Sequence, residues 1–339
     1  MHKSITIQQV AERANVSIMT VSRVLNGSSK VAESTRQRVQ EAMQALGYRP
    51  NVAARRLASA RSYMIGLLYD NPSEGYVSQF LLGALEHSRR KGYHLVVEHC
   101  RGDELTAVEQ LMALLNESQI DSVILLPPLC DDLALLAALR QRQLPFVRVA
   151  PDREPGLSPY VCMDDQRAAY RLTQHLIEKG HQKIGFIKGN PNQGVSRQRY
   201  AGYLEAMAHH GLTTPEDWVQ QGYFCYRSGM EAAHALLSQQ DRPSAVFASN
   251  DDMAAAVVAE AHRCGLKVPE QLAVVGFDDT QLATAIWPQL TTIRQPIRQM
   301  AQRAVDILAD QPELLAEDDH PGHVLAFEVI LRGSSTTGA

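Results

Sequence analysis

Hydrophobic and polar positions divide the chain into a short helical head and a longer body. Within the first fifty residues, apolar side chains recur every three or four positions, which is the period of an amphipathic helix. This pattern predicts helices over Ile7–Ala14, Ile18–Leu25 and Thr35–Leu46. The head is therefore predicted to be an all-α domain over residues 1–50.

Residues that begin or end helices separate these three segments. Thr6 and Gln9 form a capping-box pattern, and Ser17 and Ser34 are predicted to cap the second and third helices. Asn15 stands in the turn between the first two helices, where Asn tolerates a left-handed backbone. Two helices joined by a tight turn and braced by a third predict a helix-turn-helix.

After Ser62, apolar runs of strand length alternate with helical stretches. Strands are predicted over Met64–Asp70, His94–His99, Ser122–Leu126, Pro145–Val149, Lys183–Lys188, Ala245–Ser249 and Leu272–Phe277. Helices are predicted over Gly75–Lys91, Leu105–Glu117, Gln166–Lys179, Arg197–His210, Asp252–Cys264 and Ile297–Ala309. Such alternation predicts parallel sheets, here in two sets that divide near residues 160–164, with a return crossing near Leu290–Gln295. The fold class is thus a helix-turn-helix head plus an α/β core of two doubly wound lobes with a ligand cleft between them.

Charge changes this picture, because it is divided unevenly. The whole chain has a formal net charge of −4, which alone argues against nucleic acid. Residues 1–62 carry ten basic and three acidic side chains, a net charge of +7. The remaining 277 residues carry 23 basic and 34 acidic side chains, a net charge of −11. A basic head on an acidic body is typical of a protein whose head binds a polyanion, although a solvated helical surface would give the same excess.

The second helix of the head carries side chains suited to a DNA groove. Arg23 can present its planar guanidinium to a guanine edge, and Ile18 and Met19 can contact thymine methyls. Side chains that can donate to phosphates are Ser17, Thr20, Ser22 and Asn26. The alternative is a purely structural helix pack whose polar face meets water.

Several other classes of protein are disfavoured. The sequence contains no P-loop, no dinucleotide-binding glycine motif after the first strand, no H-E-x-x-H and no G-x-S-x-G. Its five cysteines are scattered and its twelve histidines lack metal-ligand spacing, so neither a disulfide framework nor a metal site is expected. No apolar run is long enough to span a bilayer, and no secretory signal begins the chain. We therefore expect a cytoplasmic protein that is not an enzyme and holds no cofactor.

The head closely resembles that of the lac-repressor (LacI/GalR) family. Residues 6–27 and 35–51 match the family in order and spacing, with Asn15 as a departure where the family usually has Gly. Residues 51–59 resemble the family's hinge helix, which implies a helix that forms on DNA, pairs with its two-fold mate and inserts Leu57 into the minor groove. The alternative is a linker with a chance leucine. The DNA contacts predicted besides the second helix are Thr6, Asn51, Ala54, Arg55 and Leu57.

The body also resembles this family, whose core is a pair of lobes like those of periplasmic sugar-binding proteins. The resemblance implies effector contacts from Arg199, Asn250 and Asp278, and from Phe224 as an aromatic that stacks on a sugar. In the N-terminal lobe, Leu68–Asn71 and Leu126–Pro128 are predicted as edges of the cleft, and Asp70 is added as an effector contact. The alternative for each of these residues is a helix cap or a surface ion pair, and Asn250 and Asp279 in particular could cap the helices they precede. Arg148 stands near where many members have an Asp-Arg pair, so it could face a ligand or pair with a neighbouring acid.

These observations predict a transcriptional regulator, most plausibly a repressor of carbohydrate-utilisation genes. It would bind a palindromic DNA operator as a homodimer and respond to a small sugar-like effector, without contact to a membrane. The predicted parts are a head over 1–50, a hinge and linker over 51–62 and a core over 63–333. Within the core, the N-lobe comprises about 63–161 and 293–322, and the C-lobe about 162–292 and 323–333. The alternative is a cytosolic sugar-binding or carbohydrate-acting protein with an accessory basic head.

Overall fold

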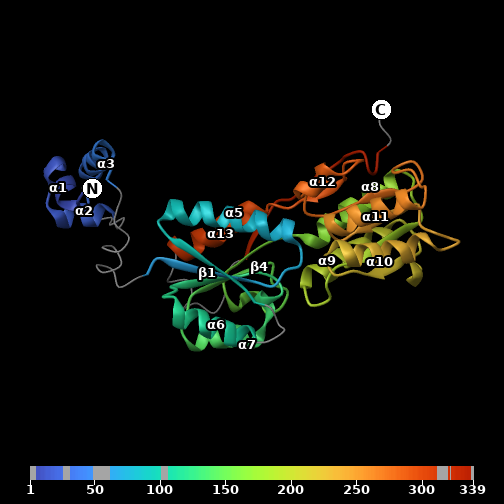
Figure 1. Cartoon of the computed structure of the whole chain (residues 1–339), viewed down its shortest axis with the longest axis horizontal. Helices are drawn as coiled ribbons and strands as arrows, with labels where there is room; N and C mark the ends of the chain where they lie inside the picture. The colour runs from blue at the N-terminus through green and yellow to red at the C-terminus, as the bar shows by residue number, and fades with distance from the viewer. Residues whose placement is uncertain are drawn as a thin grey trace. The chain divides into compact units, whose positions relative to one another are not determined.

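The computed structural model describes residues 5–25, 31–48, 62–100, 106–310, 320 and 322–336. The chain forms two compact units, Met1–Tyr63 and Met64–Ala339, which are treated separately here. The first holds the helical head and the second the α/β core (Figure 1). No helix among the described residues has both the length and the apolar character needed to cross a membrane.

Three helices form the head: α1 (Ile7–Ala14), α2 (Ile18–Leu25) and α3 (Glu33–Leu46). Thr6 and Gln9 make both hydrogen bonds of the predicted capping box, and Asn15 adopts the left-handed conformation with φ of 51°. The Ser17 hydroxyl accepts from the Thr20 backbone N–H at 3.1 Å, as a cap of α2 does. The first two helices therefore begin and end where the sequence predicts.

The predicted cap of the third helix is wrong. α3 begins at Glu33, so Ser34 lies inside its first turn, and the capping residue Ala32 makes no side-chain hydrogen bond. An acidic residue in the first turn stabilises the positive end of a helix without a side-chain cap, and Glu33 supplies it. The core of the head is built from apolar side chains of all three helices: Val10, Ala11, Ala14, Val21, Val24, Val39 and Ala42.

The first lobe of the core is a parallel sheet of six strands covered on both faces. The strands lie in the order β11-β5-β4-β3-β1-β2. They are β1 (Met64–Tyr69), β2 (His94–His99), β3 (Ser122–Leu125), β4 (Phe146–Val149), β5 (Tyr160–Met163) and β11 (Gly322–Leu325). Helices α5 (Glu74–Lys91) and α13 (Ile297–Asp310) cover one face, and α6 (Ala107–Glu117) and α7 (Leu133–Gln141) the other (Figure 1). Short 3₁₀ turns lie at Leu129–Asp131 and Pro155–Leu157.

The second lobe repeats this design with four parallel strands in the order β7-β6-β8-β9. They are β6 (Ile184–Lys188), β7 (Val219–Gln221), β8 (Ala245–Ala248) and β9 (Ala273–Val275). Its helices are α8 (Asp165–Glu178), α9 (Gly194–His209), α10 (Tyr226–Leu237), α11 (Asp251–Arg263) and the short α12 (Gln281–Ala285), with a 3₁₀ turn at Glu216–Trp218. α8 packs against α9, and α10 packs against α11. The two doubly wound parallel-sheet lobes predicted from the sequence are confirmed.

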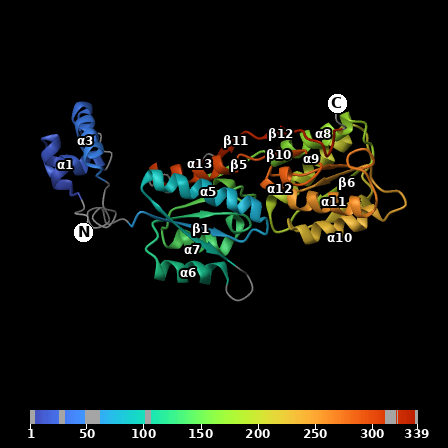
Figure 2. The same cartoon turned by 45° about the horizontal axis from the view of Figure 1, so that its top comes forward.

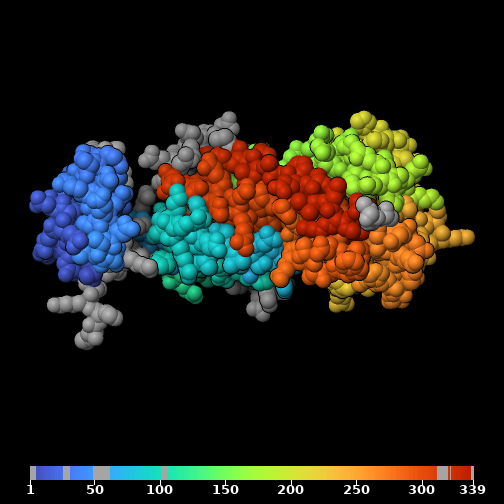
Figure 3. All heavy atoms as spheres, turned by 90° about the horizontal axis from the view of Figure 1, so that it is seen from above, coloured from blue at the N-terminus to red at the C-terminus, as the bar shows by residue number. Residues whose placement is uncertain are grey.

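Three chain segments cross between the lobes. The first follows β5, the second joins β10 (Thr292–Arg294) to α13, and the third joins β11 to β12 (Glu328–Ile330). β10 and β12 pair antiparallel and pack against α8 of the second lobe (Figure 2). Viewed from above, this last part of the chain, orange to red, covers parts of both lobes (Figure 3). The strands that lead into the crossings end at Met163, Arg294 and Leu325, two or three residues beyond the predicted lobe limits at 161, 292 and 322.

Candidate functional site

A cavity that is partly open to solvent lies between the two lobes of the core, with about 360 Å³ of space free of protein atoms when the open side is included. Side chains from both lobes and from the second crossing surround it: Asn71, Ser73, Tyr76, Pro127, Ala150, Gln193, Val195, Arg199, Phe224, Asp278 and Gln295. Most of them follow the carboxyl end of a strand or begin the next helix, which is where doubly wound folds bind ligands. Of the five predicted effector contacts, the fold brings Arg199, Phe224 and Asp278 to this cavity.

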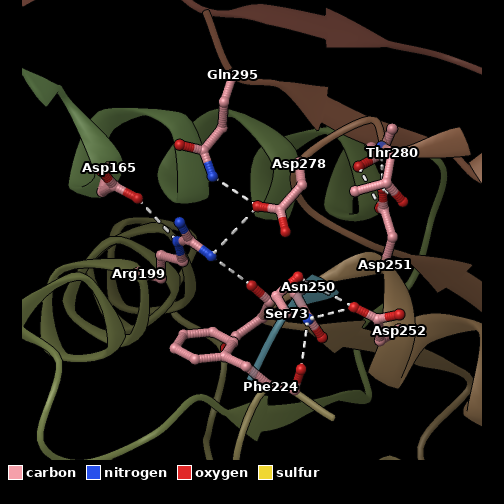
Figure 4. A network of polar contacts seen from close by, with 12 residues as sticks. Ser73, Asp165, Arg199, Phe224, Asn250, Asp251, Asp252, Asp278, Thr280 and Gln295 are labelled. Atoms are coloured by element: carbon pink, nitrogen blue, oxygen red, sulfur yellow. Dashed lines mark hydrogen bonds and ion pairs between the residues drawn. The ribbon is translucent and has the colours of Figure 1, made fainter. Parts of the chain in front are cut away.

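Arg199 lies at the centre of the polar contacts and is only 4% exposed. Its Nε donates to Asp165 Oδ1 at 2.8 Å, and its Nη1 donates to the Ser249 carbonyl at 2.6 Å. The same Nη1 lies 3.8 Å from Asp278 Oδ1 (Figure 4). The guanidinium also stacks over Phe277, with its carbon 3.7 Å from the ring centre, so its plane is held rigidly.

Asp278 faces Arg199 across the cavity from the turn that follows β9. Its Oδ1 accepts from Gln295 Nε2 at 2.5 Å, while its second oxygen points away from both partners (Figure 4). Burial raises the pKa of Asp278 well above its ordinary value, and the charge of Asp251 raises it further, against the lowering effect of Arg199. The backbone of Asp278 has φ of 116°, a region that is costly for a residue with a side chain. A strained, buried carboxyl with a free oxygen is suited to accept a hydrogen bond from a ligand.

Phe224 lines the cavity, and the side chain of Asn250 holds the backbone of Phe224 in place. Phe224 has φ of 59° and is 3% exposed, and its carbonyl accepts from Asn250 Nδ2 at 3.0 Å. Asn250 Oδ1 accepts from the Met253 backbone N–H at 3.0 Å and so caps α11. Asn250 does not line the cavity. Asn250 therefore caps α11, and it reaches the cavity lining through Phe224 and through Asp252, which also accepts from Ser73.

Asp70 lies away from the cavity lining. Its carboxylate is 43% exposed and 4.0 Å from His99 Nε2, and His99 stacks on Tyr69. The next residue, Asn71, is the one that lines the cavity, because successive residues leaving a strand point in different directions. Asp279, unlike Asn250, does not cap a helix. Its carboxylate pairs with Arg294 at 2.7 Å and with Arg332 at 2.6 Å.

Arg148 neither faces a ligand nor pairs with an acid. It is fully buried, and its Nε donates to the Ser158 hydroxyl at 3.0 Å. Its two terminal nitrogens donate to the backbone carbonyls of residues 153–155 at 2.5–3.0 Å. Burial lowers the pKa of this guanidinium. Arg148 therefore shapes the turn after β4, and none of the described first-lobe residues that line the cavity is charged.

The lining residues that the sequence did not predict include three with long polar side chains: Tyr76, Gln193 and Gln295. Tyr76 lies in the first turn of α5, Gln193 precedes α9, and Gln295 lies on the second crossing. Tyr76 and Gln193 stand at starts of helices that follow strands, a signal that could have indicated them. Gln295 gave no such signal, because its position depends on how the crossing is routed.

Direct contacts also join the lobes beside the cavity. The Ser73 hydroxyl donates to Asp252 Oδ2 at 3.1 Å, and Gln79 Nε2 donates to the Asp279 carbonyl at 3.5 Å. Asp152, from the first lobe, pairs with Arg197 of α9. The described arrangement is therefore one in which the lobes touch around the cavity.

In the head, α2 buries Val21 and Val24 and leaves the opposite side open. Ile18 is 48% exposed and Met19 is 64% exposed, values that are costly unless another surface covers these side chains. The other predicted contacts Thr6, Ser17 and Arg23 are exposed, and Thr20 and Ser22 partly so. The predicted contacts that lie outside the described residues are Asn26, Asn51, Ala54, Arg55 and Leu57.

Both parts of the chain match known proteins. The family of bacterial regulatory proteins called lacI matches residues 6–51, and a periplasmic binding protein-like domain matches residues 173–335. The HTH-type transcriptional repressor PurR of Photobacterium profundum is 31% identical over 331 residues, which cover 97% of this chain and 98% of that protein. The chain belongs to the LacI family. It is a DNA-binding transcriptional repressor of that family, as the sequence predicted.

Other relatives support the assignment of this chain to the LacI family. Catabolite control protein A of Priestia megaterium is 32% identical, over 90% of this chain and 92% of that protein. A transcriptional regulator CelR–cellobiose complex matches with a TM-score of 0.74 and 31% identity, covering 97% of this chain and 99% of that one. A lac repressor dimer bound to operator and the anti-inducer ONPF matches with a TM-score of 0.73 and 28% identity, over 98% and 99%.

Proposed function

We propose that this repressor binds a near-palindromic operator as a homodimer and is controlled by a small sugar-like effector in the cavity between its lobes. The observation that carries the effector part is the meeting of Arg199, Asp278 and Phe224 at one cavity. A guanidinium and a carboxylate serve the donors and acceptors of ring hydroxyls, and an aromatic face suits the apolar side of a sugar. That the relatives are named as repressors favours a regulator over an enzyme.

DNA reading is assigned to α2. Its exposed face joins two apolar side chains, Ile18 and Met19, to the guanidinium of Arg23, which lies one turn further along the helix. This combination suits a major groove, where thymine methyls and guanine acceptors are presented together. The hinge segment over residues 51–59 remains a prediction from its resemblance to the family.

The dimer is supported by apolar side chains left open on the first lobe. Val97 of the edge strand β2 is 42% exposed, and Leu82 of α5 is 45% exposed. Val96 packs into the cluster that lies against α6 and α7, so Val97, its neighbour, points to the α5 side of the sheet. An edge strand and a helix that expose apolar side chains on one side of a lobe suit a self-complementary contact.

Light scattering tests the dimer. Leu82→Glu and Val97→Glu should each shift the mass of the particle from two chains toward one, whereas Leu133→Glu, at an exposed leucine on the α6–α7 side, should leave it unchanged. A wild-type protein that is monomeric at micromolar concentration, or three variants that all remain dimeric, would contradict the assigned interface.

Operator binding tests the regulator as a whole. Selection from random duplexes with the full chain should recover sites of two-fold symmetry, and deletion of residues 1–60 should abolish DNA binding while leaving ligand binding in place. An effector that prefers one lobe arrangement should change operator affinity, because the effector and the operator DNA then favour different arrangements of the same two lobes. A full-length protein without sequence preference on DNA at moderate salt would refute the proposal.

A further inference from the structure

The two positive features beside the cavity are both neutralised by carboxylates of the chain itself. The first is Arg199, which lies 2.8 Å from Asp165 and 3.8 Å from Asp278. It is the only cation among the described lining residues. The second is the N-terminus of α9, a 16-residue helix whose unpaired N–H groups attract negative charge.

Asp152 already occupies that helix terminus. A methyl group built on Gly194, the first residue of α9, would collide with the Asp152 side chain, so the carboxylate lies directly against the first turn. Asp152 also pairs with Arg197 of the same helix. A ligand anion therefore has no room at the N-terminus of α9, because the Asp152 carboxylate already lies there.

Carboxyl groups outnumber cations around the cavity. Asp165 and Asp278 together outnumber Arg199, and Asp252 lies just behind Ser73, which lines the cavity. Burial raises the pKa of Asp165, of Asp252 and of Asp278, which shows that this environment penalises additional negative charge. An anionic ligand would lose its hydration and gain no free cation in return.

Neutral donors, in contrast, are unused. Gln193 is 2% exposed, lines the cavity, and its Nε2 has no hydrogen-bond partner among the described residues. A buried donor without a partner is costly, and an acceptor atom of a ligand would remove that cost. Tyr76 also lines the cavity, and burial raises the pKa of its phenol far above the ordinary value, so the hydroxyl stays protonated.

We infer that the cavity takes an uncharged polyhydroxy ring, held through an acceptor oxygen by Gln193, and rejects phosphorylated and carboxylated counterparts of the same ring. This inference rests on the proposed sugar effector and adds its charge class and a specificity-determining residue. Asp278 and Arg199 then serve ring hydroxyls as acceptor and donor, and neither has to neutralise a ligand charge.

Calorimetry and thermal melting of the full-length protein test the charge class with matched pairs. The probes are D-ribose and ribose 5-phosphate, D-glucose, glucose 6-phosphate and glucuronate, and cellobiose. A neutral member should raise the melting temperature, and its charged counterpart should bind at least 100-fold more weakly. A phosphorylated member that binds as tightly as its neutral partner overturns this inference and leaves the sugar effector standing. If no sugar of either charge binds while a neutral nucleobase does, the proposed effector class fails, and this inference fails with it.

Gln193→Leu tests the donor. The variant should weaken binding of the neutral sugar at least tenfold without lowering the melting temperature of the ligand-free protein, because the amide has no partner to lose. Gln240→Leu, at an exposed glutamine between α10 and β8, is the matched control and should bind normally. Unchanged affinity in Gln193→Leu overturns the assignment, and so does a lower ligand-free melting temperature, which would mark Gln193 as structural.

Discussion

Asp251 is a fully buried carboxyl whose replacement should change how stability depends on pH. It begins α11, and its Oδ1 accepts from the Thr292 hydroxyl at 2.7 Å. Its Oδ2 accepts from the backbone N–H and hydroxyl of Thr280 at 2.7 and 3.2 Å. Asp251 therefore ties the turn that carries Asp278 to β10. Asp251→Asn keeps this shape and removes the ionisable proton.

The magnitude follows from the pKa. Burial raises the pKa of Asp251 to about 7 from an ordinary value of 3.8. The folded protein thus binds this proton more tightly than the unfolded chain does, so the resulting stabilisation is fully present below about pH 4 and is lost as pH rises to about 7. At 1.36 kcal/mol for each pKa unit, the contribution amounts to about 4 kcal/mol.

In Asp251→Asn this loss should disappear. Between pH 5 and pH 8 the free energy of unfolding should fall less than in the wild type, and at pH 8 the variant should be the more stable by about 2 kcal/mol. This difference is smaller than the contribution of about 4 kcal/mol, because the substitution itself costs about 2 kcal/mol. The new amide nitrogen replaces one carboxylate oxygen, so the Thr292 hydroxyl has to accept a hydrogen bond instead of donating one.

Urea unfolding followed by tryptophan fluorescence measures this difference. Trp218 is buried in the second lobe and reports on it, whereas Trp287 is 82% exposed and should change little. Asp217→Asn, at an exposed carboxylate, is the control and should follow the wild-type pH profile. A difference between Asp251→Asn and wild type that stays constant from pH 5 to pH 8 would refute the reasoning, since Asp251 would then not titrate in the folded state.

Four further predictions follow from named contacts. Arg23→Ala should relax discrimination at one base pair in each half-site and cost about 1–3 kcal/mol in operator binding, whereas equal weakening on all DNA would reassign Arg23 to phosphate. Asp278→Ala should abolish the effector response in operator titrations while operator binding persists, and an unchanged ligand titration would make Asp278 a structural residue only. Arg148→Met should lower the free energy of unfolding by about 3 kcal/mol because four hydrogen bonds disappear; a loss below 1 kcal/mol would show that water replaces them. Asp279→Asn should change the effector Kd only slightly and should have a larger effect on the ratio of operator affinities measured with and without effector. A larger change in the effector Kd than in this ratio would place Asp279 in the binding site.

Local patterns predicted the parts of the fold that depend on neighbouring residues. Apolar spacing and caps located α1 and α2 to the residue, because a two-turn helix is defined by its own stop signals. Helices α7 and α10 were not predicted. α7 is apolar over most of its length and so lacks a distinct polar face, whereas the buried side of α10 is built largely of small side chains that give only a weak apolar signal in the sequence.

The candidate site was predictable where strand ends determine it. Arg199, Phe224 and Asp278 meet because strands of one parallel sheet end at the same edge. Asp70 was predicted as a contact, but its neighbour Asn71 lines the cavity, and Asn250 caps α11 instead of lining it. Both outcomes depend on side-chain direction. The place of Gln193 before α9 could have been predicted, but its unpartnered amide is a property of the packed structure.

The turn that carries Asp278 is also the turn that is bonded to the crossings between the lobes. Asp278 accepts from Gln295 on the second crossing. Asp279 pairs with Arg294 at the end of β10 and with Arg332 just after β12, the strand into which the third crossing leads. Any rotation of the lobes has to bend these crossings, because they are the covalent connections between the two sheets. A ligand that accepts a hydrogen bond from Gln295 therefore competes for a contact that fixes the crossing, and its binding energy can favour one lobe arrangement without any contact to the head.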